Sequence, residues 1–279
     1  MSLIFIPSDG LGNLLFQHHA AYSFAKKQGL DLHAMGYYSY YDVRPKFGEY
    51  KKLFAHVKIL GDETTAEKTI DYEQDPTRAR INNVIQLGVD PRTLYMEQGH
   101  QYFPIPAGAR ILSGYFQSWK YFDEFRTEIR DVLHLNESEL WSKQKAKFQG
   151  GICVHVRRGG DAADRPEIHP LTSPSYYDRA MTLFPGSKFL VFCEEPALIK
   201  DWPVWSGRDV EFVDEPGALA TMFLMSCCDH FILANSSLSL NAYYLRDQDT
   251  ATVVAPSDWF GPAGPKFNIH DIIDKGTII

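Results

Sequence analysis

The sequence predicts an α/β protein with parallel, doubly wound sheets in two domains. Short apolar runs alternate with segments of helical periodicity, first near the N-terminus and then throughout the second half. Strands joined by helices pair in parallel, because each crossover returns the chain to the same edge of the sheet. A polar, lysine-bearing stretch over residues 136–149 marks the domain junction. We therefore expect two Rossmann-like domains, residues 1–145 and 146–279, that face a cleft.

The first domain opens with a strand, a glycine turn over residues 8–13 and a helix that Gly29 ends. Between residues 36 and 108 the pattern is too weak to place elements. The other elements of this half follow from apolar runs and from helical spacing. The strands are expected at 3–6, 31–34 and 111–115, and the helices at 14–28 and 121–133.

The second half alternates strand and helix more regularly. Ser173 and Pro174 are typical of a helix start, as N-cap and first-turn residue. The strands are expected at 151–156, 188–193, 210–213, 230–234 and 251–255, and the helices at 173–183, 196–202, 218–227 and 237–245.

Composition limits the class of protein. The net charge of −7 over 279 residues argues against a broad nucleic-acid surface. No apolar run reaches the about 20 residues that span a bilayer, and the apolar start, Met1 to Pro7, is too short for a signal peptide. The four cysteines form no C-x-x-C pair and predict buried thiols. A cytoplasmic protein is expected, with a peripheral place at a membrane face left open.

Two arginines follow the first strand of the second half. Arg157 and Arg158 stand directly after it, and two glycines come next. Ligands of open α/β sheets bind outside the carboxyl ends of strands, where guanidinium groups match phosphate oxygens. His155 could bond a base edge or a phosphate. The alternative is a pair of surface charges bridged to Asp161 or Asp164.

Two further strand ends of this half carry polar residues. Asn235, Ser236 and Ser237 could bind phosphate at a helix N-terminus or simply cap that helix. Glu194 and Glu195 could accept hydrogen bonds from the ring nitrogen and amino group of guanine. The alternative for the two acids is a favourable position at a helix N-terminus.

The glycine turn of the first half could approach a phosphate through Gly10 and Gly12, or could be a tight connection only. The chain lacks both G-x-G-x-x-G and a P-loop, which argues against a nicotinamide dehydrogenase. The letters D-x-D occur at residues 247–249, in a polar loop after a helix, and predict a turn. The histidines show no paired zinc spacing. No metal site is predicted.

Five segments in register resemble glycosyltransferase family 11, the α-1,2-fucosyltransferases. The family patterns are G-R-L-G-N-Q-M-F-Q, G-Y-F-Q-S-x-x-Y-F, H-x-R-R-G-D, M-S-x-C…N-S-T-F-S-W-W and A-P-x-x-W-F. The matching segments are residues 10–17, 114–122, 155–161, 225–239 and 255–260. The chain departs from the family by an extra glycine before Asp161, by Leu240 and Asn241 in place of W-W, and by Glu194 and Glu195 where other acids are common.

The resemblance implies a GT-B architecture, in which 146–279 binds the GDP-sugar and 1–145 lies on the acceptor side. It implies an inverting, metal-independent enzyme without a cofactor. Such an enzyme moves L-fucose from GDP-fucose to a glycan hydroxyl, O2 of galactose being the expected one. A transferase for another GDP-sugar and a non-catalytic GDP-sugar-binding protein are the alternatives.

The resemblance also implies roles for individual residues. Arg157 and Arg158 would neutralise the departing GDP, Asn13 would lie near the transferred sugar and the acceptor, and Asp161 is the candidate base. The remaining residues expected to contact the donor are His155, Glu194, Glu195, Asn235, Ser236, Ser237, Gly10 and Gly12.

Overall fold

The computed structural model describes residues 1–35, 53–60, 89–133, 145–158, 164–214, 217–246 and 250–279. Contacts divide the chain into two compact units, Met1–Leu133 and His134–Ile279. Each unit contains one parallel sheet, which confirms the predicted α/β class. The acceptor-side and donor-side roles of the two units stay predictions.

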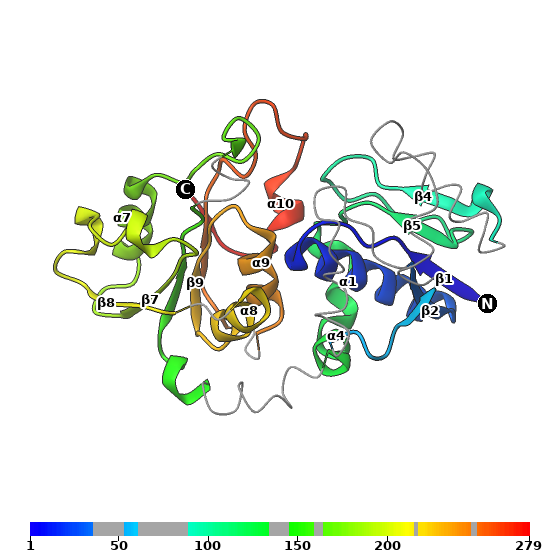
Figure 1. Cartoon of the computed structure of the whole chain (residues 1–279), viewed down its shortest axis with the longest axis horizontal. Helices are drawn as coiled ribbons and strands as arrows, with labels where there is room; N and C mark the ends of the chain where they lie inside the picture. Colours follow the sequence, from blue (N-terminus) through cyan, green and yellow to red (C-terminus); the bar gives the residue numbers. More distant parts are fainter. Residues whose placement is uncertain (36–52, 61–88, 134–144, 159–163, 215–216, 247–249) are drawn as a thin grey trace. The chain divides into compact units, whose positions relative to one another are not determined.

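The sheet of the first unit has five strands in the order β3-β2-β1-β5-β4, and every pair is parallel (Figure 1). β1 is central, with Ile4 paired to His33 on one side and to Ile111 on the other. Two of the five strands, β3 and β4, were not predicted, because three residues are too few to show a period. The strands are β1 (Ser2–Phe5), β2 (Asp31–Met35), β3 (Lys58–Leu60), β4 (Leu94–Met96) and β5 (Ile111–Ser113).

Helix α1 (Leu11–Gln28) follows β1 and ends, as predicted, at Gly29, whose φ of 63° is the left-handed conformation that suits glycine. The helix begins three residues earlier than expected. Leu11 and Leu15 lie one turn apart and are both buried, so burial extends the helix back to Leu11. Gly12 therefore belongs to the first helical turn, and the preceding turn is shorter than predicted.

The helix expected at 121–133 is mostly wrong in its first half. The chain forms two 3₁₀ turns, η3 (Trp119–Tyr121) and η4 (Asp123–Phe125), before α4 (Arg126–Val132) begins. Phe122 lies between the turns with a non-helical φ of −136°. Its ring is buried and lies 5.8 Å from that of Phe16, so tertiary packing overrides the helical period there.

The second sheet has six parallel strands in the order β11-β10-β9-β6-β7-β8. The five predicted strands are confirmed, and β11 is an addition of two residues. The strands are β6 (Ile152–His155), β7 (Lys188–Phe192), β8 (Asp209–Phe212), β9 (His230–Ile232), β10 (Val253–Ala255) and β11 (Thr277–Ile278).

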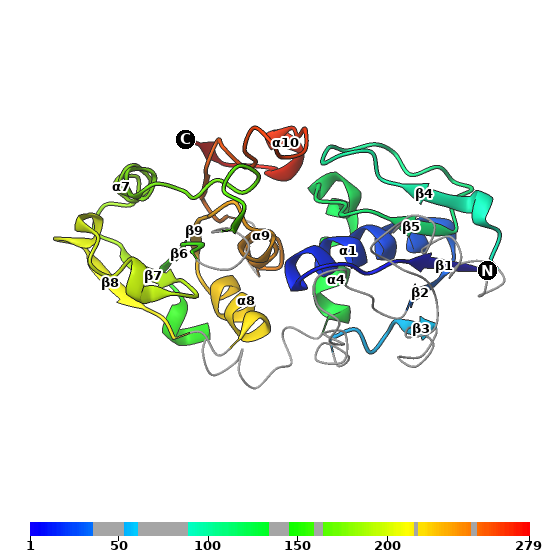
Figure 2. The same cartoon turned by 45° about the horizontal axis from the view of Figure 1, so that its top comes forward.

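Helices lie on both faces of this sheet, as the doubly wound prediction requires; Figure 2 shows α7 on one side of the strands and α8 and α9 on the other. Tyr176, Tyr177 and Met181 of α7 pack with Val154 and Val191 of the sheet in one buried cluster. The helices are α7 (Pro174–Thr182), α8 (Ala218–Ser226), α9 (Ser237–Tyr244) and the short α10 (Ile269–Ile272).

Two helix predictions of this unit have different outcomes. Ser173 is the N-cap of α7 and accepts a hydrogen bond from the Tyr176 amide at 3.3 Å, as predicted. The helix expected at 196–202 is wrong, since only the turn η5 (Pro196–Leu198) forms. Pro203 explains part of the loss, because a residue before proline avoids the helical region, and Trp202 is extended at ψ 133°.

All four cysteines are buried and free, as predicted. Among the described residues, no helix combines the length and the apolar character needed to cross a membrane.

Candidate functional site

The second sheet reverses its order between β6 and β9. From β6 the chain adds β7 and then β8 on one side, and it then crosses over to add β9, β10 and β11 on the other. Ligands of open α/β sheets bind outside the carboxyl ends of the strands at such a reversal. Arg157 follows β6 and Asn235 follows β9, so the fold brings two separately predicted segments to this point.

Arg157 joins the two strand ends directly. Its Nη1 donates a hydrogen bond to the backbone carbonyl oxygen of Asn235 at 3.2 Å. The side chain is half-buried, so a fixed positive charge lies at the reversal. The alternative for the arginines was a bridge to Asp161 or Asp164. Asp161 lies outside the described residues, as do residues 247–249, and Asp164 is exposed.

Arg158 is held by different contacts. Its Nη1 donates to the carbonyl oxygen of Arg157 at 2.9 Å, and its Nη2 donates to that of Thr172 at 2.5 Å. Its guanidinium carbon lies 4.9 Å from the ring centroid of Trp202. These contacts anchor Arg158 to the loop before α7. A phosphate contact of Arg158 stays a prediction, and it would use the remaining donors of the guanidinium group.

His155 is the last residue of β6 and is 5% exposed. Burial, and then the charge of Arg157, lower its pKa to about 3, so the imidazole is neutral at neutral pH. Tyr177 donates a hydrogen bond from its hydroxyl to the His155 carbonyl oxygen at 3.1 Å. Within the described part of the chain, the buried Nδ1 of His155 has no hydrogen-bond partner. A neutral ring with an open nitrogen can bond a nucleotide base.

The side chain of Asn235 links two loops around the site. Its Nδ2 donates to the carbonyl oxygens of Pro170 at 2.9 Å and Trp259 at 3.3 Å. The side chain is 5% exposed. Because both of its amide hydrogens are engaged, what Asn235 provides at the reversal is the carbonyl oxygen that orients Arg157.

Ser236 is the N-cap of α9, and its Oγ accepts a hydrogen bond from the Leu238 amide at 3.3 Å. The capping interpretation is therefore confirmed. Ser237 is the first helical residue and is partly exposed. The start of α9 lies beside Arg157, where backbone N–H groups and the helix dipole favour an anion. A phosphate at Ser236 and Ser237 stays a prediction.

Glu194 and Glu195 follow β7, the neighbour of β6 in the sheet, and both are exposed. Their place at the same edge as Arg157 was predicted. Glu195 is the N-cap residue of the 3₁₀ turn η5 and makes no capping hydrogen bond with its side chain, so the alternative position at a helix N-terminus holds for a single short turn only. A contact with guanine stays a prediction.

The sheet of the first unit also reverses its order beside β1: β2 and β3 extend one side, and on the other side the chain forms the edge strand β4 before β5 pairs with β1. Asn13 lies in the first turn of α1, after β1, and Gln117 lies in the loop after β5. Gln117 Nε2 donates a hydrogen bond to Asn13 Oδ1 at 2.7 Å. Each unit thus has one polar side chain bonded across the reversal of its own sheet.

Gly10 is the N-cap residue of α1, with φ −75° and ψ 172°. Any residue can adopt this conformation, and a Cβ atom there would meet no heavy atom within 4 Å. The fold of the unit therefore does not require a glycine at this position. Open space beside a helix N-terminus suits the predicted approach of a ligand, whereas Gly12 is buried within α1.

One acidic residue that bonds the loop after β5 was missed from the sequence. Glu97 follows β4, and its Oε2 accepts hydrogen bonds from the amides of Tyr115 at 2.7 Å and Phe116 at 2.8 Å. Burial raises its pKa to about 7, against the opposing effect of those two bonds. Glu97 lies in the region where the sequence pattern is weak. The available signal was an acid directly after a short apolar run and two residues before a glycine.

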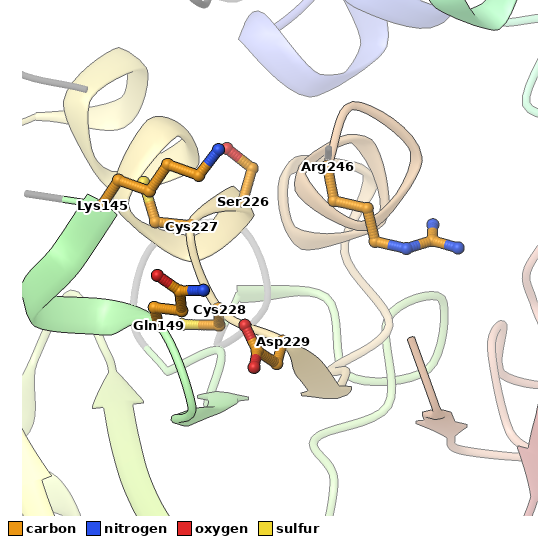
Figure 3. A pocket seen from close by; sticks show the side chains of 7 residues that line it. All are labelled: Lys145, Gln149, Ser226, Cys227, Cys228, Asp229 and Arg246. Carbon is orange, nitrogen blue, oxygen red and sulfur yellow. The ribbon is translucent and has the colours of Figure 1, made fainter. Parts of the chain in front are cut away.

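A small pocket lies at the opposite edge of the second sheet. Gln149 and Asp229, which precede β6 and β9, line it together with Lys145 and Arg246 (Figure 3). It is therefore separate from the carboxyl edge that holds Arg157. In the described ranges, no group of three or more histidine, cysteine or acidic side chains could hold a metal ion.

Comparison with known proteins extends these observations. The model of the family described as "Glycosyl transferase family 11" matches residues 95–262. An alpha-1,2-colitosyltransferase of Escherichia coli is 25% identical over 270 residues, covering 91% of this chain and 90% of the relative. A galactoside 2-alpha-L-fucosyltransferase of Caenorhabditis elegans is 25% identical over 296 residues, covering 84% of this chain and 80% of the relative.

Among solved structures, the E. coli ADP-heptose LPS heptosyltransferase II aligns with a TM-score of 0.52 and 11% identity, covering 100% of this chain and 90% of that chain. At this identity the likeness concerns the fold alone. Together with the two parallel α/β units, it confirms the predicted GT-B-like class.

Proposed function

Because this chain belongs to glycosyltransferase family 11, whose model matches more than half of its residues, we propose that it transfers L-fucose from GDP-fucose to a hydroxyl group of a glycan. We further propose that this hydroxyl is O2 of a galactose residue. The observation that carries the proposal is the hydrogen bond from Arg157 to the Asn235 carbonyl at the reversal of the second sheet. It fixes a cation beside the start of α9, where a diphosphate would bind.

The charge changes of the reaction explain why a fixed cation is needed. Breaking the bond between fucose and phosphate builds positive charge on the sugar ring and negative charge on GDP. A guanidinium group that is already oriented stabilises this change more than it stabilises the ground state. Arg157 takes this role in our proposal, and Arg158 supports it from the adjacent position. The transfer inverts the anomeric centre and needs no metal ion.

The proposed donor contacts follow the strand ends. Ser236 and Ser237 bind phosphate at the N-terminus of α9, and Glu194 or Glu195 accepts hydrogen bonds from guanine. The neutral ring of His155, with its buried open nitrogen, supports a contact with the nucleotide. Asp161 stays the proposed base for the acceptor hydroxyl.

In the first unit, Asn13 contacts the sugar or the acceptor. Gly10 and Gly12 are proposed to let the backbone come near the donor. The open space at the Gly10 position supports this proposal.

A second candidate sugar comes from the colitosyltransferase named above. A different nucleotide-linked sugar would use the same diphosphate site, since the charge change on the leaving group is the same. What distinguishes the two candidates is the preference for the transferred sugar. The diphosphate contacts do not depend on it.

The test is GDP release with GDP-fucose and a panel of galactose-terminated disaccharides, with GDP-mannose as the comparison donor. We expect release that depends on the acceptor, and a product with fucose on O2 of galactose. Equal or better turnover of another GDP-sugar would contradict the choice of fucose. Tight GDP-fucose binding by calorimetry without turnover of any acceptor would instead identify a non-catalytic binding protein.

A further inference from the structure

The loop after β5 is a turn with two residues in the left-handed region. Gly114 has a φ of 152° and Phe116 a φ of 53°. A non-glycine residue at positive φ is uncommon, and such strain persists only where the surroundings over-determine it. The ring of Phe116 is buried and lies edge-on to Tyr121 at 5.3 Å. Ring burial alone fixes the side chain, so the backbone amides need partners of their own.

Glu97 supplies those partners. One carboxylate oxygen accepts both the Tyr115 and the Phe116 amide hydrogens. A Cβ atom on Gly114 would lie 2.4 Å from the Cβ of Glu97, so only glycine fits opposite this side chain. The Glu97 carboxylate therefore fits this turn both by its hydrogen bonds and by the absence of a side chain at position 114.

The next residue of the turn reaches the predicted ligand-binding residue of this unit. Gln117 is 8% exposed, and its Nε2 donates to Asn13 Oδ1 at 2.7 Å. This bond orients the Asn13 amide, because it occupies the oxygen and directs the Nδ2 group elsewhere. What Asn13 can offer a ligand is then a donor of two hydrogens.

We propose that Glu97 is a positioning residue for the transfer reaction. Its carboxylate holds the turn over residues 114–117, and the turn holds the Asn13 amide so that Nδ2 donates to an oxygen atom of a sugar substrate. The inference rests on the proposed function for its substrate and on the structure for the path from Glu97 to Asn13.

The protonation of Glu97 makes the inference measurable. Its pKa of about 7 follows from burial. A protonated carboxyl group is a weaker acceptor than a carboxylate, so the turn loosens as the pH falls through 7. Among the described residues, the phenols of Tyr95 and Tyr121 face Glu97, and burial raises the pKa of both. Tyr115 is the titratable residue of the turn itself, and the ring of His100 stacks on it at 5.2 Å.

The kinetic experiment compares wild type, Glu97→Gln and Glu97→Ala between pH 6 and 8. We expect wild-type kcat to fall about tenfold from pH 8 to pH 6, as for a required group with this pKa. Glu97→Gln keeps the shape of the side chain and an oxygen that accepts hydrogen bonds. Its kcat should therefore no longer fall between pH 8 and pH 6. Glu97→Ala should lower kcat about 10- to 100-fold with little change in the KM for GDP-fucose. His100→Gln is the matched control, and its kcat should fall between pH 8 and pH 6 as in wild type.

A residue that only stabilised the fold would lower the unfolding temperature and leave the pH profile unchanged; that result overturns the inference. Combining Glu97→Ala with Gln117→Ala tests the path, because two residues that act in series give less than additive losses in kcat. Additive losses contradict it. The effect of Asn13→Ala on donor hydrolysis without acceptor tells which sugar Nδ2 contacts, since only a contact with fucose changes that rate.

A measurement without substrate separates this inference from the proposed function. The side-chain amide signal of Asn13, assigned by its loss in Asn13→Asp, should shift in NMR spectra with a midpoint near pH 7 in wild type. It should not shift in Glu97→Gln. If the chemical shift of the Asn13 amide in wild type does not change with pH, the role of Glu97 is overturned, whether or not GDP-fucose is turned over. If the Asn13 signal shifts with pH but no acceptor receives a sugar, the proposed function is overturned and the role of Glu97 is not.

Discussion

The guanidinium carbon of Arg158 lies 4.9 Å from the ring centroid of Trp202, whereas its neighbour Arg157 bonds the carbonyl oxygen of Asn235. Two adjacent residues of one motif are thus held by different parts of the unit. Arg158 is fixed from the side of α7 and Arg157 from the side of α9. This division leads to different expectations for the two variants.

Arg157→Lys should lower kcat about 10²- to 10³-fold, the loss typical of one oriented donor in a charge-stabilising site. A lysine cannot bond the Asn235 carbonyl and also present a planar fork to phosphate. The unfolding temperature should change little, because lysine keeps the positive charge and most of the aliphatic stem of this half-buried side chain. Steady-state kinetics with GDP-fucose and calorimetry at equal pH measure both effects. A variant with wild-type kcat would remove Arg157 from the reaction.

Arg158→Ala should lower stability by about 1–2 kcal/mol, because it loses two hydrogen bonds to backbone carbonyls and a cation–π contact. Trp202→Leu removes the ring contact together with the packing of that ring on Tyr177 and Trp205, so it should cost more than the about 0.5–1 kcal/mol of the cation–π contact. The double variant should cost less than the sum, since both changes remove the same contact. Urea unfolding of the three variants measures this coupling. Fully additive losses would show that the ring does not stabilise Arg158.

Stability should fall at acidic pH because of His18. This side chain is fully buried, and burial, followed by the nearby His19 and His56, holds its pKa well below 6.5. The unfolded chain takes up a proton near pH 6.5, whereas the folded chain does not, so stability is full above this pH and is lost as the pH falls. At pH 5 the loss from one such group is at most about 2 kcal/mol.

Urea unfolding at pH 7.5 and pH 5.0 measures this loss. His18→Gln should show a smaller difference between the two pH values than wild type. The exposed His270 gives the matched control, and His270→Gln should behave as wild type. Equal pH dependence of His18→Gln and wild type would mean that another group causes the loss. Glu97 has the opposite effect on the free energy of unfolding between about pH 4.5 and 7. Its folded pKa is raised, so its contribution to stability increases as the pH falls.

Two glycines of the first unit give contrasting expectations. Gly29→Ala should cost about 1 kcal/mol, since φ 63° is unfavourable for alanine. Gly10→Ala should leave the unfolding temperature unchanged, because its φ is ordinary and the added methyl group has room. If a ligand approaches the backbone there, turnover by Gly10→Ala should fall about tenfold or more. Full activity would show that Gly10 does not approach the donor.

Transfer should persist in excess EDTA, within about twofold of the untreated rate, because the arginines stabilise the departing diphosphate in place of a metal ion. The assay is GDP release before and after dialysis against chelator. Loss of activity that Mg²⁺ or Mn²⁺ restores would contradict the proposed metal-independent mechanism.

The regular second half explains why much of its architecture could be predicted. β6, β7 and β9 are buried apolar runs that end in polar residues, so both their existence and the placement of Arg157, Glu194 and Asn235 at one edge follow from the sequence. The sequence does not show that the Asn235 amide is used up by two loop carbonyls, because these contacts join residues distant in the chain.

The first unit was harder to predict for physical reasons. Its strands β3 and β4 are three residues long, and the 3₁₀ turns around Phe122 follow from packing against Phe16. Glu97 was missed for the same reason, since its importance comes from amides 18 and 19 residues further along the chain. Local patterns report the face of an element, and they do not report which loop a carboxylate will hold.

The polar bonds across the two reversals each close within a single unit, Arg157 to Asn235 in one and Gln117 to Asn13 in the other. In each half, the hydrogen bond that orients Arg157 or Asn13 is therefore made by a residue of the same half. We therefore expect that the two halves can be exchanged between relatives. A chimaera that joins residues 1–133 of one family member to residues 134–279 of another should inherit its nucleotide preference from the second parent and its acceptor range from the first.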